Sequence, residues 1–428
     1  MDLTHLQSVR TSLINDQNPD QSNDILLIIP QELLLSILYF LDIASIFSLS
    51  RSSKKYTSLS YHNIGTIHSN AISNGHYNLF KWLIPTKEIP STTNTLFTRR
   101  AAEYGQLDIL RYLHENGCEW NGWTCADAAE NNHLEVLKYL NNNGCPFSEL
   151  SLYSAIRRGN LECFKYIHET VGCPLNIHRC DFAASNGQLE ILKYLQTQCI
   201  FTTSTTSTIA SACANSVSSD DVVLNIIEYL RENGCPWDRS ACNEASAYGR
   251  LVILKYLHEN GCPWSESACA NAAIYGRLEV LKYLHENGCP WGSIARTYAI
   301  TYGHLGIMRY LHENRCPMNP NENECYHASL NGHLDILKYL HENGYAWNQS
   351  CCSHAIRNGH FEVLKYLHDN GCPWDHNSCG YAAVTNNLEI LQYLHENGCP
   401  WTEDVYTSAT KNGNFEIVRY LHENGCPR

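Results

Sequence analysis

An eight-residue string, YLHENGCP, recurs along the chain and constrains the fold more than any other feature of the sequence. Aligning its tyrosine divides most of the chain into thirteen units, of which the first has Trp82 at this position. The other twelve have Tyr112, Tyr139, Tyr166, Tyr194, Tyr229, Tyr256, Tyr283, Tyr310, Tyr339, Tyr366, Tyr393 and Tyr420. Most steps are 27 residues long, as from Tyr256 to Tyr283. Because such a period lets each unit contact only its neighbours, it predicts one elongated stack.

Seven units close on a tryptophan, and the next residue predicts where a first helix begins. That residue always belongs to the set that favours helix N-caps, whose side chains or small size serve the free N–H groups of a first turn. The seven residues are Asn121, Asp238, Ser265, Gly292, Asn348, Asp375 and Thr402. In the unit at residues 265–291, the first helix therefore begins at Ser265 and ends near Gly276.

The second half of the same unit predicts a second helix. Its apolar stripe consists of Leu278, Val280, Leu281 and Leu284. Asn287 and Gly288 then supply a left-handed stop, and Pro290 prevents continuation of the helix. Each unit is therefore expected to form two short antiparallel helices, neither of which is stable alone.

These residues resemble the ankyrin repeat. The pattern is Ala272-Ala273-x-x-Gly276-x-Leu278-Glu279-Val280-Leu281-x-x-Leu284-x-x-x-Gly288. The family's hairpin finger and its Thr-Pro-Leu-His opening are missing, and a short Cys-Pro-Trp connection replaces them, as in the expanded ankyrin families of amoebae, oomycetes and giant DNA viruses. The resemblance covers residues 66–428 and implies an all-α, ankyrin-like helix-turn-helix solenoid.

One step in the array is longer than the others. Between Tyr194 and Tyr229 lies a Ser/Thr-rich run at residues 201–208 that lacks the Gly-Cys-Pro stop. We interpret residues 201–219 as an insertion that separates repeats 1–5 (residues 66–200) from repeats 6–13 (residues 220–428). The run is expected to form an exposed loop or hinge, and a passive insertion is favoured over a phosphorylated one.

Residues 25–65 fall outside the repeat and predict three short helices. An apolar stripe follows Pro30, which is tolerated in a first helical turn. The stretch resembles an F-box, because Ile29-Pro30-x-Glu32-Leu33-Leu34-x-x-Ile37-Leu38-x-Phe40-Leu41-Asp42 follows that family's opening pattern. Tyr56 stands where the family usually has tryptophan. Residues 1–24 are polar and are expected to be disordered.

The F-box resemblance implies a partner, the Skp-type adaptor of a cullin ubiquitin ligase, with the repeats capturing a protein substrate. The adaptor-binding residues would be Ile29, Pro30, Leu33, Leu34, Ile37, Leu38 and Leu41. The alternative is a plain ankyrin scaffold in which these helices only cap the end of the stack.

Histidine and cysteine are plentiful, but their spacing does not predict a metal centre or a catalytic site. Pairs such as Cys262 and Cys269 recur with the repeat, lack the C-x2–4-C spacing of zinc sites, and suit positions that need a small hydrophobe. Disulfides between equivalent positions are excluded by the ~8–10 Å between packed helices. The histidine of HENGC favours surface or inter-unit hydrogen bonding over acid–base catalysis. We expect no enzyme activity, no metal and no cofactor.

Charge limits the partners further. Against 30 Lys and Arg stand 43 Asp and Glu, a formal net charge of −13, and there is no basic run. This balance argues against nucleic acid and against an anionic membrane surface. No signal-peptide pattern or membrane span is recognised. We expect a monomer with reduced thiols, located in the cytoplasm or also in the nucleus.

The positions that packing leaves free predict where a protein substrate binds. Just before the glycine of the first helix, three consecutive units carry Tyr248, Tyr275 and Tyr302, and Tyr104 occupies the same position earlier. Tyrosine supplies large, rigid contact area with a hydrogen-bonding end. The rim of this row would consist of Asn243, Asn271, Tyr298, Tyr326 and His327. The alternative is that duplicated units merely retain the same surface residue.

Overall fold

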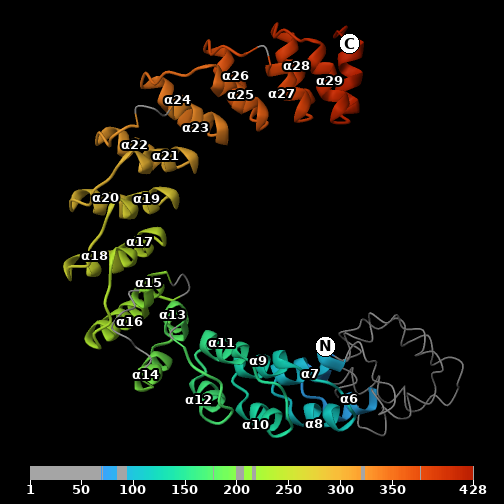
Figure 1. Ribbon diagram of the computed structural model, residues 1–428, viewed down its shortest axis with the longest axis vertical. Helices are drawn as coiled ribbons and strands as arrows, with labels where there is room; N and C mark the ends of the chain where they lie inside the picture. Colours follow the sequence, from blue (N-terminus) through green and yellow to red (C-terminus); the bar gives the residue numbers. More distant parts are fainter. Residues whose placement is uncertain are drawn as a thin grey trace, which may run out of the picture. The chain divides into compact units, whose positions relative to one another are not determined.

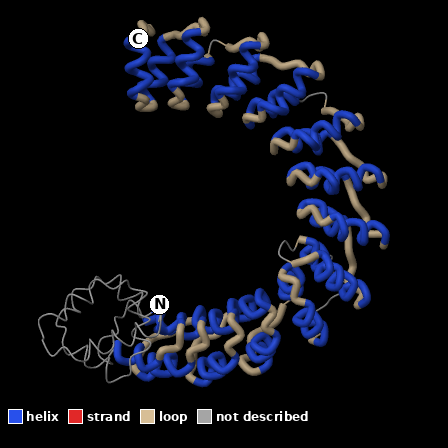
Figure 2. Tube along the Cα trace, turned by 180° about the vertical axis from the view of Figure 1, so that it is seen from behind, coloured by secondary structure: helices blue, strands red, loops and turns tan. Residues whose placement is uncertain are grey.

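The computed structural model describes residues 69, 71–83, 94–176, 178–198, 207–214, 218–319, 323–375 and 377–427. These residues form 25 helices and, across the described ranges, no strand, as Figure 2 shows. They fall into two compact units that divide between Glu119 and Trp120. The adaptor-binding residues predicted between Ile29 and Leu41, and the predicted disordered segment at 1–24, lie outside the described residues.

The first unit contains α6 (Tyr77–Leu83), α7 (Asn94–Glu103) and α8 (Leu107–Glu115). Helix α6 carries the tryptophan that opens the array, and α7 and α8 are the helix pair of the next repeat. Aromatic rings hold the unit together. The ring of Phe80 meets those of Phe97 and Tyr112 edge to face, with centroids 5.9 and 6.4 Å apart, a favourable ring geometry.

The second unit repeats the same helix pair eleven times. Its helices are α9 (Gly122–Glu130), α10 (Leu134–Asn142), α11 (Glu149–Arg158), α12 (Leu161–Glu169), α13 (His178–Ser185), α14 (Leu189–Thr197), α15 (Ser207–Cys213), α16 (Asp220–Glu232), α17 (Arg239–Ala247), α18 (Leu251–Glu259), α19 (Glu266–Ile274), α20 (Leu278–Glu286), α21 (Ser293–Thr301), α22 (Leu305–Glu313), α23 (Glu324–Asn331), α24 (Leu334–Glu342), α25 (Gln349–Arg357), α26 (Phe361–Asp369), α27 (Ser378–Val384), α28 (Leu388–Glu396), α29 (Glu403–Lys411) and α30 (Phe415–Glu423). Odd-numbered helices are the first and even-numbered helices the second of each pair. From α17 to α25 the first helices lie on the inner side of a curved stack (Figure 1).

The predicted N-caps are confirmed at six of the seven positions. At Asn121, Asp238 and Asn348 the side-chain oxygen accepts a hydrogen bond from a first-turn N–H. The exception is Asp375, because α27 begins later and its N-cap is Asn377. The Asp375 carboxylate still accepts the Asn377 N–H at 3.0 Å, so it serves the same turn from one position further out.

In several repeats, a polar side chain just after the glycine that ends the first helix links the repeat to the one before it. His304 Nε2 donates to the Ile274 carbonyl at 2.9 Å, and His333 Nε2 donates to the Thr301 carbonyl at 3.0 Å. The glycine at the end of the first helix in the preceding repeat makes room for this link. At Gly276, φ is 71°, and an added Cβ would lie 2.8 Å from His304 Cε1. This position therefore needs glycine both for its left-handed backbone and for the neighbouring imidazole.

The predicted loop at residues 201–208 is wrong at its carboxyl end. Ser207 and Thr208 begin α15, a first helix that packs between α13 and α17. Thr208 is fully buried, and its hydroxyl donates to Asp181 at 2.7 Å. The composition suggested a solvated run, but Ile209 and the following residues supply an apolar face that the neighbouring repeats cover. Residues 201–206 lie outside the described residues.

The cysteines among the described residues are free thiols, and all but Cys173 are buried. This burial confirms that they serve as small hydrophobic side chains. Burial raises the pKa of the Cys118 and Cys235 thiols to about 11. In one repeat the first-helix thiol and the thiol after the helix stop are in contact, with Cys125 Sγ 3.0 Å from Cys145 Sγ. Such neutral, buried thiols are poor nucleophiles.

Candidate partner-binding surface

The three tyrosines predicted to form a row are exposed at equivalent places in consecutive repeats. Tyr248, Tyr275 and Tyr302 are the C-caps of α17, α19 and α21. Their exposed fractions are 43, 56 and 52%, although large hydrophobic side chains elsewhere in these repeats are mostly buried. The apolar face of each first helix packs against its neighbours, so the C-cap side chain is left facing solvent.

The rim residues Tyr298, Tyr326 and His327 are half-buried and lie on α21 and α23. The rings of Tyr298 and Tyr302 are 6.2 Å apart. The ring of Tyr326 lies 5.1 Å from that of His327. The predicted residues therefore form one ring pair on α21 and another on α23, which are neighbouring first helices. The other two rim residues, Asn243 and Asn271, contact each other through a bond from Asn271 Nδ2 to the Asn243 carbonyl at 3.1 Å.

Two residues of this surface were missed by the sequence analysis. His354 on α25 packs edge to face on Tyr326, with ring centroids 4.7 Å apart. Tyr381 on α27 stacks beneath the guanidinium of Arg357 at 3.8 Å. A positional signal could have found them, because His327, His354 and Tyr381 align with Tyr298, five residues before the glycine or asparagine that follows the first helix.

Together these side chains form what we call the aromatic strip, which crosses the first helices of six consecutive repeats. Its members are Tyr248, Tyr275, Tyr298, Tyr302, Tyr326, His327, His354 and Tyr381. Tyr104 holds the equivalent C-cap position in the first unit and is 40% exposed. Large aromatic side chains at a surface are the chemistry that dominates protein–protein recognition.

The histidines of the YLHEN string have a different role, on the second helices. His258 Nδ1 shares a hydrogen bond of 3.1 Å with the Tyr283 hydroxyl of the next repeat, and the imidazole stacks on Trp264 at 3.9 Å. The same histidine–tyrosine bond recurs at His285, His312, His341, His368 and His395. The predicted inter-unit role of this histidine is therefore confirmed at these six positions.

Comparison with known families settles the nature of the repeats. A model of "Ankyrin repeats (3 copies)" matches residues 68–151, 100–179, 269–351, 325–405 and 352–427, which together span more than half of the chain. The chain belongs to the ankyrin-repeat family. A model of the F-box domain matches residues 26–62. Both predicted resemblances are confirmed, and this ankyrin-repeat protein also carries an F-box. The two families are typical of non-enzymatic adaptors for protein interaction.

Individual relatives add little to the family assignment. No curated protein matches the chain. Among solved structures, the human ASB11 ankyrin repeat domain is 20% identical, with a TM-score of 0.38, and covers 44% of this chain and 100% of its own. The pentatricopeptide repeat protein PPR10, solved with an 18-nt psaJ RNA element, is 13% identical with a TM-score of 0.39, and the match covers 85% of this chain and 58% of that one. At these TM-scores neither similarity carries an argument about function.

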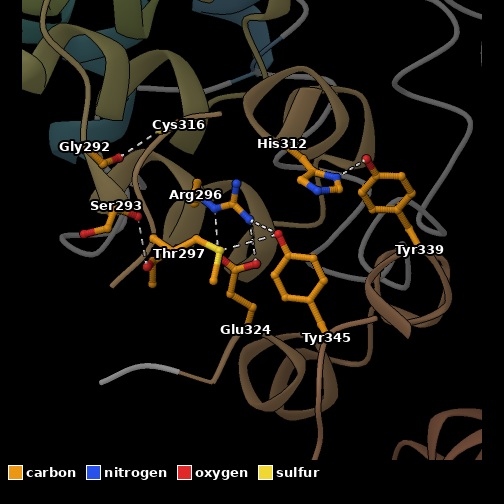
Figure 3. Close-up of polar contacts among 10 residues, drawn as sticks. Gly292, Ser293, Arg296, Thr297, His312, Cys316, Glu324, Tyr339 and Tyr345 are labelled. Carbon is orange, nitrogen blue, oxygen red and sulfur yellow. Dashed lines mark hydrogen bonds and ion pairs between the residues drawn. The ribbon is translucent and has the colours of Figure 1, made fainter. Parts of the chain in front are cut away.

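A buried ion pair holds together the ankyrin repeats at the middle of the aromatic strip (Figure 3). Arg296 of α21 is 2% exposed and donates to both carboxylate oxygens of Glu324 in α23, at 2.7 and 2.9 Å. It also donates to the Tyr345 hydroxyl at 2.7 Å. Arg296 replaces the cysteine found at Cys269, and Tyr345 replaces the cysteine after the helix stop. The charged group therefore joins two neighbouring ankyrin repeats, neither of which has a complete thiol pair.

Two further findings concern the described part of this ankyrin-repeat protein. None of its helices is long and apolar enough to cross a bilayer. Within the same residues, no group of three or more His, Cys, Asp or Glu side chains is placed to hold a metal ion.

Proposed function

We propose that the chain recruits a protein substrate to a cullin-type ubiquitin ligase in the cytoplasm or nucleus. The segment at residues 25–65 would dock on a Skp-type adaptor, and the aromatic strip would capture the substrate. The observation that carries this proposal is the presence in one chain of an F-box match at residues 26–62 and an exposed aromatic surface on the repeats. The first feature supplies a link to the ligase, and the second supplies a surface for selection.

The strip suits substrate capture because its side chains lose little conformational entropy on binding. Tyrosine and histidine have two side-chain torsions, and each presents a flat ring with a polar end. Contacts such as that between Tyr326 and His354 hold the rings in place before a partner arrives. A preformed aromatic surface therefore binds at lower entropic cost than a flexible one.

The adaptor half of the proposal is tested with the full chain and a purified Skp-type adaptor. We expect saturable binding by calorimetry, and we expect Leu34→Arg or Pro30→Ala to abolish it. Tyr302→Ser serves as the matched control, because the aromatic strip is not part of the adaptor contact. If the unsubstituted chain does not bind the adaptor, the plain ankyrin scaffold replaces the ligase role.

The substrate half is tested by proximity labelling in cells with the full chain. The triple variant Tyr248→Ser, Tyr275→Ser and Tyr302→Ser should lose a defined set of labelled proteins while still binding the adaptor. The control is Tyr104→Ser, which changes the same C-cap position outside the strip. Labelling that is unchanged in the triple variant would show that duplicated repeats merely retain these tyrosines.

A further inference from the structure

We propose that the aromatic strip binds an extended, proline-rich segment in the polyproline II conformation. This inference rests on the proposed function, because it specifies the class of partner that the strip would capture. It is carried by three features of the strip: the spacing of its tyrosines, its low charge, and the hydrogen-bonding ends of its side chains.

The spacing of the strip follows from the stacking of the repeats. Helices α17, α19 and α21 pack side by side in sequence order. Their C-caps Tyr248, Tyr275 and Tyr302 therefore recur at the distance between packed helices, about 8–10 Å. A polyproline II helix rises about 3.1 Å per residue with three residues per turn, so every third residue returns to the same side after about 9.3 Å. One turn of such a ligand matches one repeat.

The other regular conformations fit this surface less well. In a β-strand, side chains on one face recur every two residues, or about 6.7 Å, so successive anchors would drift away from successive tyrosines. An α-helix satisfies its own carbonyls internally, so its backbone offers the tyrosine hydroxyls few acceptors. A polyproline II segment has no internal hydrogen bonds, and its carbonyls can accept from those hydroxyls. Aromatic-lined surfaces recognise such segments elsewhere by this combination of contacts.

The charge of the strip favours a ligand that is recognised by shape and apolar contact. At the position of Tyr302 and four residues before it, the six repeats from α17 to α27 present twelve side chains, of which only Glu244 is acidic and none is lysine or arginine. One basic group touches the strip, because the exposed guanidinium of Arg357 covers the Tyr381 ring at its end. Burial raises the pKa of the Glu244 carboxyl above its usual value. In a chain of net charge −13, this surface of low charge stands apart. It is therefore matched to proline and aliphatic side chains more than to a charged partner.

The length of the strip sets the length of the ligand. Six repeats contain five intervals, which at about 9 Å each extend over roughly 45 Å. A polyproline II segment of about 15 residues covers that distance. Shorter segments would contact fewer tyrosines, so the affinity should rise with length up to about 15 residues and then level off.

The test uses the full chain and three fluorescein-labelled peptides of 15 residues, measured by fluorescence polarisation. The peptides are all-proline, Gly-Ser, and an alanine-rich helix former with leucine at every seventh position. We expect the all-proline peptide to saturate below 1 mM and to bind at least tenfold more tightly than the other two. The triple variant Tyr248→Ser, Tyr275→Ser and Tyr302→Ser should weaken its binding at least tenfold, whereas Tyr104→Ser should leave binding within twofold.

Absence of saturable all-proline binding, equal binding of the Gly-Ser or helical peptide, or unchanged binding by the triple variant would each overturn the inference. Circular dichroism of the triple variant checks that it is folded, and single serine variants, each with a smaller loss, provide a second measure if it is not. If the proximity labelling of cellular proteins depends on the strip but polyproline does not bind, this inference falls while the proposed function stands. If labelling is independent of the strip, the proposed function falls as well.

Discussion

The buried pair formed by Arg296 and Glu324 allows a quantitative test of how the middle repeats are held together. Their side chains are 2 and 9% exposed, so solvent screens the pair little. Removing one partner leaves an uncompensated buried charge, which costs about 3–5 kcal/mol, whereas replacing both by apolar side chains is often nearly neutral. We therefore expect Arg296→Met and Glu324→Met each to destabilise the middle repeats by about 3–5 kcal/mol, and the double variant to destabilise them much less than either single variant.

The measurement is amide hydrogen exchange of α21 and α23 in the full chain, because opening in a repeat array is local and global unfolding would average it. The matched control is the surface pair of Arg157 and Glu130, whose side chains are 53 and 21% exposed and whose carboxylate also contacts Arg158. Breaking that pair should cost about 0–1 kcal/mol. The reasoning is refuted if Arg296→Met lowers the local free energy of opening no more than Arg157→Met does. It is also refuted if the losses of the Arg296→Met and Glu324→Met variants simply add in the double variant.

Further predictions concern pH, the links between repeats, and α15. Burial raises the pKa of Cys180 and Cys325 to about 12, so the folded thiols retain protons that the unfolded chain releases above pH 9. The free energy of unfolding should therefore be unaffected below pH 9 and fall as the pH rises from 9 to 12, by up to about 1.4 kcal/mol per pH unit for each such thiol. Thermal melting across this pH range measures the effect. His304→Ala should cost about 1–3 kcal/mol in urea unfolding because the Ile274 carbonyl loses its donor, and unchanged stability would show that water replaces the imidazole. Deleting residues 207–213 should disrupt the neighbouring repeats, seen as a loss of helix by circular dichroism larger than seven residues account for; a loss confined to the deleted segment would restore the loop interpretation.

Much of the fold could be predicted because the repeat reports the same constraint many times. The leucine stripe of the second helix, the N-cap and the glycine stop each recur at one position, and a recurring residue identifies a packing or backbone requirement. Single departures from the pattern were harder to interpret. The Ser/Thr-rich run that ends in α15 suggested a solvated loop by its composition, but the buried Thr208 has a partner in Asp181 that only the folded stack brings near.

The candidate surface could be predicted in part for a related reason. Identical tyrosines in consecutive repeats are visible in the sequence, whereas a column that changes chemistry from one repeat to the next is not. His327, His354 and Tyr381 share one position, and their relation becomes apparent only when the first helices are aligned on the left-handed glycine or asparagine that follows each of them. The pair of Arg296 and Glu324 is similar, because its members lie one repeat apart and neither resembles the residue usually found at its position.

The distribution of variation along the array separates what stacking requires from what a partner could select. Positions that face a neighbouring repeat are nearly uniform, as at Leu257, Leu284 and Leu311, because each must fill the same volume against the same surroundings. Positions that face solvent on the first helices are free of that requirement. There the chain places rings in six consecutive repeats, and the position of Tyr302 and the position four residues before it hold no lysine or arginine in these repeats. Solvation alone would favour charged residues at exposed sites of an acidic protein. A sustained departure from that expectation, confined to one face and to consecutive repeats, is the physical basis for assigning recognition to the aromatic strip and stability to the residues beneath it.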